Sequence, residues 1–280
     1  MKAKLTWCFL RNSVDADVHR EPKSSLGQKP DNNGTLFKAT ARAFFPASYS
    51  GSGTNNPMIE YSRVNPSPRY QELLGLYKQM HTEGAESVNL PPEKTFPGLS
   101  LKNHVVRIGM IIEILGSETI LDYGSGKGKQ YGPVEIATRD GRTFLSIKDF
   151  WRVSSITCFD PAYEPFSVLP EGKYDGVVST DVLEHCPKED VPWIINEMFS
   201  YAREFVFMNV ACYPAVKTLP NGENAHCTVE PVEWWKDLMD DAVAQHPGLR
   251  YYAEFSHPDP LEVSGKKHIL SFVSGKHRER

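Results

Sequence analysis

Two acids and a histidine follow a short apolar run near residue 181, and their spacing suits acid–base chemistry or metal binding. Asp181, Glu184 and His185 lie at positions i, i+3 and i+4, which share one face of a helical turn. A second histidine, His226, lies in a polar loop after the next predicted strand. A histidine with an ordinary pKa of about 6.5 can remove a proton at neutral pH, and mixed carboxylate and imidazole ligands suit Mg, Mn, Fe or Zn. We therefore expect His185, His226 and Glu184 to be catalytic, or all four residues to bind a divalent metal.

The second chemical signal is a glycine-rich run that directly follows an apolar segment. Residues 119–123 are mostly apolar or β-branched without alternation, which is typical of a buried parallel strand. Gly124, Gly126 and Gly128 follow on alternate positions, and glycines there let the backbone turn tightly and approach a ligand closely. A helix that starts near Lys127 would also point its free N–H groups at that ligand. The run predicts a cofactor loop at the carboxyl end of a strand.

Two phosphate-binding motifs fit this run poorly. The dinucleotide fingerprint is Gly-x-Gly-x-x-Gly, but here the third glycine comes one residue early, at Gly128, and Lys129 stands in its place. A phosphate-cradling P-loop requires Ser or Thr after Gly-Lys, but Gln130 follows Lys129. A nicotinamide-dependent oxidoreductase is therefore an alternative enzyme class that the glycine spacing disfavours.

An acid also ends the next predicted strand. Residues 155–159 read as a buried strand, and Asp160 follows at its carboxyl end, where a carboxylate can bind the hydroxyls of a ribose. The interval from the glycine run exceeds the roughly 20 residues of the dinucleotide fingerprint, so we expect residues 133–150 to form an insertion with a turn at 138–142. Asp160 precedes Pro161, and the alternative is that this Asp-Pro pair only starts a turn.

The glycine run resembles the first motif of class I S-adenosylmethionine (SAM) methyltransferases, in the form Asp122-x-Gly124-x-Gly126-x-Gly128. With Asp160 and the 181–185 motif following in order, the resemblance covers roughly residues 101–272. It implies that the glycine run holds the methionine end of SAM, that Asp160 binds the ribose, and that the next two residues lie beside the adenine. The implied cofactor-binding residues are Asp122, Tyr123, Gly124, Gly126, Lys127, Gly128, Asp160, Pro161, Ala162, Asp181 and Val182.

The 181–185 motif is also similar to a metal-binding motif of two methyltransferase groups, the small-RNA 3′-terminal 2′-O-methyltransferases and the ubiquinone-pathway O-methyltransferases. In both groups an acid-x-x-Glu-His motif binds a divalent metal, and in the RNA group a later histidine completes the site. The resemblance implies Mg or Mn bound by Asp181, Glu184, His185 and His226. This chain departs from the pattern in having Asp at the first position and no evident RNA-binding tail.

These resemblances imply a SAM-dependent methyltransferase that methylates a hydroxyl, because a histidine or a metal helps to deprotonate a hydroxyl. The acceptor would be a small molecule or a glycan, and residues 217–226 and 233–235 are similar to bacterial and phage methyltransferases of unassigned or surface-glycan-related role. An RNA 3′ end is the other acceptor that the resemblance allows. A non-catalytic, methyltransferase-like partner subunit is the alternative outside enzymes.

The predicted elements alternate between helix and strand and indicate an α/β fold. We expect a Rossmann-like doubly wound sheet with a C-terminal antiparallel strand pair at 249–255 and 267–273. The third strand would be absent or reduced, because residues 161–173 are too few for a helix and a strand. The predicted domains are a loosely ordered N-terminal arm (1–57), a helical cap (58–118) and a SAM-binding methyltransferase domain (119–280). The helices are expected at 70–81, 101–115, 188–201 and 231–243.

Composition limits the partners and the compartment. The 280 residues are 40% hydrophobic with a formal net charge of -4, so a sizeable core is expected and no global field attracts nucleic acid or an anionic membrane. The five cysteines form no Cys-x-x-Cys pair, which favours a reduced, cytoplasmic protein. No apolar run reaches membrane-spanning length, and the N-terminal one is too short for a signal peptide. We expect no membrane partner, and composition gives no oligomeric state.

Overall fold

The computed structural model describes residues 60–138, 141–258 and 268–276. The chain divides into two units, Met1–Asn56 and Pro57–Arg280, and the fold described is that of the second unit. The predicted N-terminal arm, residues 1–57, lies outside the described residues. The predicted cap and sheet domain, residues 58–118 and 119–280, both belong to the second compact unit.

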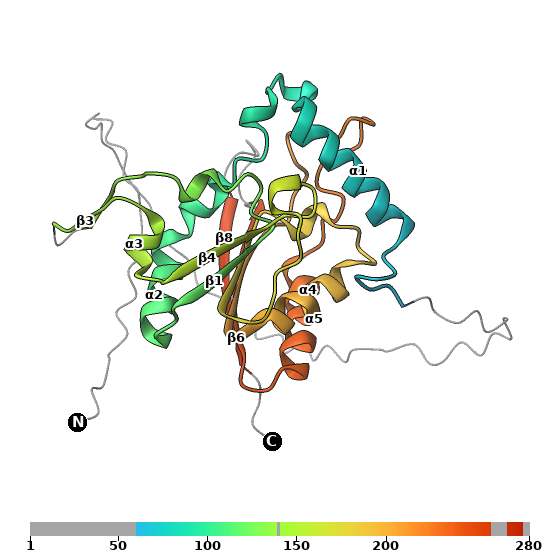
Figure 1. The fold of residues 1–280 in the computed structure, drawn as a ribbon. Coiled ribbons are helices and arrows are strands. Elements are labelled where there is room, and N and C mark those ends of the chain that lie inside the picture. Colours follow the sequence, from blue (N-terminus) through green and yellow to red (C-terminus); the bar gives the residue numbers. More distant parts are fainter. Residues whose placement is uncertain (1–59, 139–140, 259–267, 277–280) are drawn as a thin grey trace, which may run out of the picture. The chain divides into compact units, whose positions relative to one another are not determined.

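A six-stranded sheet in the order β4-β1-β5-β6-β7-β8 forms the centre of this unit (Figure 1). Neighbouring strands are parallel from β4 to β7, and β8 pairs antiparallel with β7 at the edge. In chain order the parallel strands follow the sequence 2-1-3-4-5, which is a common doubly wound order. The sheet is therefore compatible with a Rossmann-like fold, and the predicted C-terminal antiparallel pair is confirmed. The strands are β1 Thr119–Tyr123, β4 Ser155–Phe159, β5 Tyr174–Thr180, β6 Ala202–Ala211, β7 Arg250–Pro258 and β8 His268–Lys276.

Helices cover both faces of the sheet (Figure 1). α2 Val105–Leu115 and α3 Ile147–Trp151 pack on one face, and α4 Val191–Tyr201 and α5 Val232–Gln245 pack on the other. Successive side chains of a strand point to opposite faces. Val177 of β5 accordingly belongs to the α4–α5 core and Val178 to the α2–α3 core, and both are fully buried. Two apolar cores therefore hold the central strands in place.

The four helices predicted from apolar spacing are present, with shifted ends. The helix predicted at 70–81 is α1 Pro68–Glu83, which begins early because Ser67 Oγ accepts a hydrogen bond from the Tyr70 N–H at 3.0 Å. The predicted segment 101–115 is divided between a 3-10 turn, Leu99–Asn103, and α2. Within the ranges that the structure describes, no helix is long and apolar enough to span a bilayer.

No α-helix starts near Lys127, and a single 3-10 turn, Lys129–Tyr131, follows the glycine run. Gly128 before the turn has a left-handed backbone with φ +64°, and Gly132 after it is extended. Pro133 follows and has no backbone N–H to continue a helix. The glycine loop therefore lacks the helix N-terminus that dinucleotide-binding folds place at the phosphates.

Two connections agree with the predictions from segment length. The insertion at 133–150 contains a small antiparallel hairpin, β2 Ile136–Ala137 and β3 Thr143–Phe144. The segment between β4 and β5 contains one 3-10 turn, Glu164–Phe166, and no strand. Among the described strands β4 is therefore at the edge of the sheet, because it pairs with β1 alone.

The cap, which comprises α1 and the segment that leads to α2, lies beyond the end of the sheet where the parallel strands finish (Figure 1). Two polar contacts fasten its start to α4. The Ser67 N–H donates to Asp190 Oδ1 at 3.0 Å, and the Arg63 guanidinium pairs with the Glu197 carboxylate. The Arg63 side chain also lies over the Trp193 ring, 4.8 Å from its centroid. These contacts hold the cap above the carboxyl ends of the strands.

Candidate functional site

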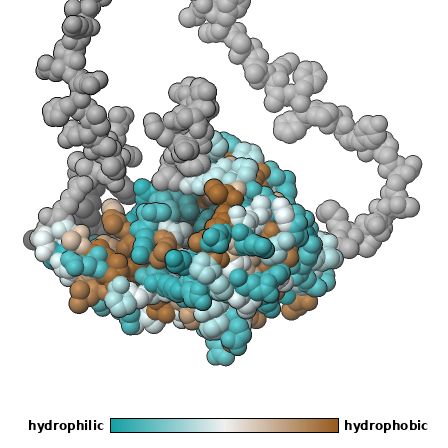
Figure 2. Space-filling model, turned by 90° about the horizontal axis from the view of Figure 1, so that it is seen from above, coloured by the Kyte–Doolittle hydropathy of each residue, from teal (hydrophilic) through white to brown (hydrophobic). Residues whose placement is uncertain are grey.

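A pocket of about 480 Å³ lies between the cap and the carboxyl ends of β1, β4 and β5, which is the place where open α/β sheets bind ligands. Its volume is within the usual range for small-molecule sites, about 300–1,000 Å³. Figure 2 looks down on this face, where apolar and polar surface lie side by side. Three segments line the pocket: α1 with residues 96–100, the turns after the three strands, and the loop 213–226 after β6.

The glycine loop forms one wall, and its backbone donors are already used. Every N–H from Gly124 to Lys129 donates within the protein. A pyrophosphate requires several free N–H groups, and this loop offers none in this conformation. The acceptors are Phe159 O for Gly124 and Ser125, Asp160 Oδ2 for Gly126, Phe96 O for Lys127, Ser125 O for Gly128 and Pro97 O for Lys129.

Close approaches explain why two of these positions are glycine. Gly126 has φ +58°, and a Cβ on it would lie 2.4 Å from the Phe96 carbonyl oxygen. Gly124 has φ +83°, and a Cβ there would lie 2.3 Å from a methyl group of Val182. The glycines therefore let the cap and the turn after β5 pack directly on the loop.

Asp160 closes this end of the pocket. Its Oδ2 accepts from the Gly126 N–H and its Oδ1 from the Ala162 N–H, each at 2.9 Å. The hydrogen bond from Ala162 starts a turn, which is the alternative role predicted for Asp160 from the Asp-Pro pair. Each carboxylate oxygen can still accept a second bond, and Asp160, Pro161 and Ala162 all line the pocket. Burial raises the pKa of Asp160, and the backbone donors oppose that shift.

Four predicted cofactor residues do not line the pocket. Asp122 is buried, and its Oδ2 accepts from Gln130 Nε2 at 2.8 Å and from the Tyr131 hydroxyl at 2.9 Å. Tyr123 turns to the other face of the sheet, where its hydroxyl accepts from Arg63 at 2.7 Å. Their alternation along β1 explains both placements. Lys127 and Gly128 also do not line the pocket. The Lys127 ammonium donates to His81 Nδ1 at 2.9 Å, and Gly128 packs against the Phe166 ring. The predicted residues that do line the pocket are Gly124, Gly126, Asp160, Pro161, Ala162, Asp181 and Val182.

Three of the four predicted metal ligands meet in the same pocket. One ligand atom from each of Asp181, His185 and His226 lies within 4.8 Å of the other two. The two imidazole rings are nearly perpendicular, with centroids 4.8 Å apart. Asp181 has a left-handed backbone with φ +62°. This conformation is unfavourable for any residue other than glycine, and such strained residues are concentrated at functional sites.

Backbone carbonyls orient both histidines. His185 Nδ1 lies 2.9 Å from Ala225 O, and His226 Nδ1 lies 2.6 Å from Tyr213 O. A carbonyl oxygen only accepts, so each Nδ1 carries the proton and each Nε2 keeps its lone pair. Ligating histidines are held in this way by a second contact. The residues present therefore fit a divalent metal better than they fit a mere packing role.

Glu184 does not join this group, which corrects its predicted roles as catalyst and ligand. Its side chain is fully buried, and its Oε1 accepts from the Ala211 N–H at 2.7 Å. The 3-10 turn covers only Leu183–His185, and Asp181 before it has a left-handed backbone, so the spacing of an α-helix does not apply across 181–185. Burial, together with the nearby Asp181 carboxylate, holds the pKa of Glu184 well above its ordinary value. Glu184 therefore supports the turn from below, and it is not among the described side chains that line the pocket.

Three further side chains that line the pocket had no predicted site role. The Tyr77 hydroxyl lies 2.9 Å from His185 Nδ1 and donates to Ala225 O at 2.7 Å. Lys217 lines the pocket from the loop after β6, and His81 lines it from α1. Tyr77 was one of the apolar positions of the first predicted helix, so its spacing indicated burial and not a polar contact. No local pattern identifies Lys217, because its contact depends on how the loop folds back.

Burial sets the charge of the site. Burial is the main reason that the pKa of His185 is lowered to about 4; Asp181 opposes this shift, and His226 and Lys217 contribute to it. Burial and the neighbouring Lys127 ammonium likewise lower the pKa of His81 to about 4. The imidazoles of His185 and His81 are therefore neutral at neutral pH, and for His185 this is the form that binds metals.

Comparison with known protein families and with curated proteins identified no relative of this chain. No protein-family model matches the chain, and no curated protein matches its sequence.

Proposed function

We propose that the protein is a SAM-dependent methyltransferase that methylates a hydroxyl acceptor. One observation carries the proposal: a single pocket contains the glycine loop with Asp160 at one wall and the Asp181, His185 and His226 group at another. The first group suits a nucleoside and the second suits a hydroxyl that must lose its proton. The doubly wound strand order, with the pocket at the carboxyl ends, supports the same proposal.

The state of the glycine loop favours SAM over a dinucleotide. SAM contains a ribose and an adenine but no phosphate, so it does not need the free N–H groups that this loop lacks. When bound, SAM would supply a sulfonium methyl group, whose transfer breaks a carbon–sulfur bond, forms a carbon–oxygen bond and releases the hydroxyl proton and a neutral thioether. Asp160 would accept from the ribose hydroxyls through its remaining lone pairs, and Pro161 and Ala162 would contact the adenine.

At the other end, His185 is better suited to be a ligand than a base. A pKa near 4 makes its imidazole a weak base at neutral pH, but it leaves Nε2 unprotonated and free to bind a cation. Asp181, His185 and His226 would hold Mg or Mn, although two imidazoles in the set also suit Fe or Zn. Such a cation would lower the pKa of an acceptor hydroxyl. Without one, His226 would be the base, with its Nε2 accepting the proton.

Calorimetric titration with SAM, and with its demethylated product, tests the proposal, each with and without Mn or Mg. We expect binding that Asp160→Asn weakens at least about tenfold, because one acceptor oxygen becomes a donor. The control is Asp237→Asn, an exposed acid on α5 away from the pocket. Tighter SAM or acceptor binding with the metal would support the cation. If the protein binds neither SAM nor its product, the proposal fails and the partner-subunit alternative stands. Tight binding of a nicotinamide dinucleotide would revive the oxidoreductase alternative.

A further inference from the structure

The wall of the pocket that faces the candidate metal group is apolar and comes from one helix. Tyr70, Leu73, Leu74 and Tyr77 of α1 all line the pocket. Their spacing of i, i+3, i+4 and i+7 places them on one face of the helix, and this face turns toward the ligand space. At the mouth, Val216 and Leu99 add apolar side chains that are 91% and 43% exposed. A ligand that fills this part of the pocket must therefore offer an apolar surface.

Aromatic rings dominate this wall. Tyr77 meets Phe96 edge to face with centroids 5.7 Å apart, and Phe96 lies 5.1 Å from the His81 ring. Aromatic pairs of this geometry are favourable beyond their buried area. A flat ring would extend the cluster, whereas a sugar or a phosphodiester chain would leave many polar groups against it without partners.

One cation faces this apolar space. Among the described residues that line the pocket, Lys217 is the only lysine or arginine. Its ammonium lies 5.2 Å from the centroid of the Phe96 ring, and no acid in the described ranges forms an ion pair with it. A half-buried ammonium next to aromatic rings is a site for an anionic group on a ligand.

The loop after β6 fixes Lys217 relative to the histidines. Its two arms fold back as a hairpin, in which the Ala225 N–H donates to Lys217 O at 3.1 Å and Thr218 pairs with Asn224. Lys217 therefore stands directly across from Ala225, whose own carbonyl holds His185, and His226 is the next residue. The hairpin is anchored on the cap, because Ser87 Oγ accepts from the Thr218 N–H at 3.2 Å. The cation and the candidate reaction centre are thus held by one small rigid unit.

We propose, resting on the proposed function, that the acceptor is a hydroxylated aromatic carboxylate. Its ring would lie against the Tyr70, Leu74 and Tyr77 wall, and its carboxylate would pair with the Lys217 ammonium. Its hydroxyl would then reach the Asp181, His185 and His226 group. The single cation is matched to one carboxylate and is too few for a polyanion such as RNA, which needs several phosphate contacts.

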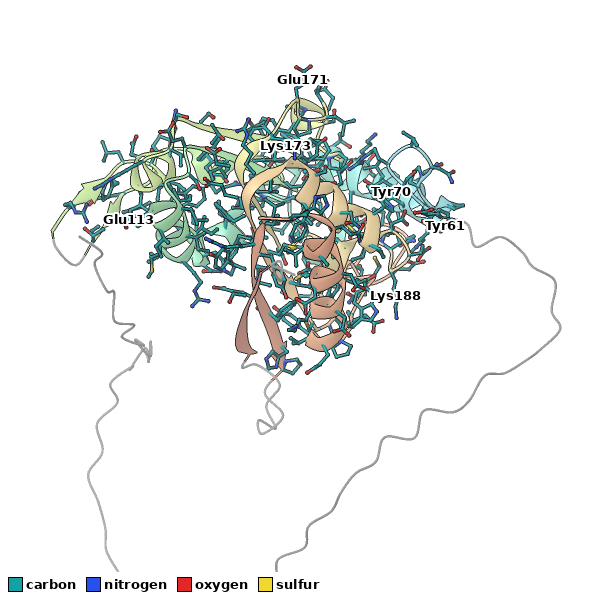
Figure 3. The ribbon with its side chains drawn as sticks, turned by 90° about the horizontal axis from the view of Figure 1, so that it is seen from below. Tyr61, Tyr70, Glu113, Glu171, Lys173 and Lys188 are labelled. Atoms are coloured by element: carbon teal, nitrogen blue, oxygen red, sulfur yellow. The ribbon has the colours of Figure 1, made fainter. Side chains whose placement is uncertain are left out.

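Calorimetric binding of para-hydroxybenzoate and of its neutral amide, para-hydroxybenzamide, to protein saturated with the demethylated SAM product tests this inference. We expect the acid to bind about tenfold more tightly than the amide. Lys217→Gln should remove that difference, and Leu74→Ala should weaken both ligands equally. Lys173→Gln is the matched control, because Lys173 is an exposed lysine before β5, at the end of the strand opposite the pocket (Figure 3). Lactate, a hydroxy acid without a ring, should bind at least tenfold more weakly than para-hydroxybenzoate.

The outcomes separate this inference from the proposed function. Equal binding of acid and amide, or a Lys217→Gln variant that still distinguishes them, would overturn the inference while SAM binding stands. A Lys217→Gln variant that loses SAM affinity instead would assign the lysine to the carboxylate of the cofactor and would also overturn it. If neither SAM nor its product binds, the proposed function fails, and the same titration on the unliganded protein still decides whether the pocket selects an aromatic acid.

Discussion

The hydroxyl of Tyr77 lies 2.9 Å from Nδ1 of His185, and this contact joins the cap to the candidate reaction centre. Both groups also contact Ala225 O, at 2.7 Å and 2.9 Å, so α1, the turn after β5 and the loop after β6 meet at one carbonyl oxygen. Burial raises the pKa of Tyr77 well above its ordinary value, so the phenol keeps its proton. The cap therefore does more than cover the pocket, because it fixes the orientation of a side chain in it.

Tyr77→Phe keeps the ring and removes this contact. We expect Mn affinity, and turnover where an acceptor is known, to fall about tenfold, as for the loss of other contacts that orient a ligating histidine. SAM affinity should change less than about twofold, since Tyr77 stands at the other end of the pocket. The control is Tyr251→Phe, which removes a 2.6 Å hydrogen bond to Asp240 away from the pocket and should cost stability alone. Equal loss of Mn affinity in both variants would contradict the positioning role.

Gly126→Ala tests whether the glycine loop needs its close contact with the cap. The added Cβ would meet the Phe96 carbonyl oxygen at 2.4 Å, a backbone atom that moves only if the cap moves. Gly172→Ala is the matched control, because Gly172 also has a positive φ, +74°, but nothing within 4 Å of an added Cβ. We expect Gly172→Ala to cost about 1–2 kcal/mol of stability through backbone strain alone. Gly126→Ala should cost more and weaken SAM binding, and equal costs in thermal unfolding would show that the contact is unimportant.

Much of the fold follows from patterns that are local in the sequence. β1 and β5 carry adjacent apolar residues, Ile120 with Leu121 and Val177 with Val178, which require burial on both faces, and parallel strands with helices on both sides meet that requirement. The segment 161–173 is too short for a helix and another strand, whatever the rest of the chain does. No α-helix follows the glycine loop, because Gly132 and Pro133 end the 3-10 turn there. Other helices begin or end at residues that differ from the predicted ones, because capping side chains such as Ser67 set the ends.

The site was only partly predictable, for two physical reasons. The placement of Asp181 and Asp160 depends on strand ends, which the sequence marks clearly. Glu184 was assigned from helical spacing, but only Leu183–His185 form a turn and Asp181 lies outside it, and the Glu184 side chain is buried. Asp122 was assigned from its motif, although strand alternation already turns it away from the pocket. Contacts between distant segments, such as Tyr77 with His185, have no local signature.

His226→Gln and Asp181→Asn test the metal group. Mn binding followed by electron paramagnetic resonance should weaken at least about tenfold in each variant, because each removes one of three ligands. Glu184→Gln should weaken it much less, since Glu184 is not in the group and holds the Ala211 N–H instead. His246→Gln, a histidine stacked on Phe199 away from the pocket, is the control. Loss of Mn binding in Glu184→Gln alone would place the cation elsewhere.

His81 should make stability depend on pH in the acid range. Its pKa is lowered from 6.5 to about 4 by burial and by Lys127, so the unfolded chain binds the proton more tightly. The stability that the neutral imidazole contributes is present above about pH 6.5 and is lost as the pH falls toward 4. Urea unfolding at neutral pH and at pH about 5 should therefore show a smaller loss in His81→Gln than in the unmodified protein, by about 1–2 kcal/mol. An identical loss in both proteins would contradict the prediction.

Asp122 should make stability depend on pH in the opposite direction, so that stability falls as the pH rises. Burial raises its pKa from 3.8 to about 7, while the hydrogen bonds from Tyr131 and Gln130 oppose the shift. The stability linked to this carboxyl is fully present below about pH 3.8 and is lost as the pH rises through 7, because ionisation of the buried group is costly. Asp122→Asn cannot ionise, so its free energy of unfolding should fall less than that of the unmodified protein between pH about 5 and pH about 8. Asp175→Asn, an acid whose pKa is lowered by backbone and side-chain donors, is the control and should not reduce that fall. If Asp122→Asn loses as much stability with rising pH as the unmodified protein, Asp122 is ionised throughout, and its contacts with Gln130 and Tyr131 outweigh the cost of burial.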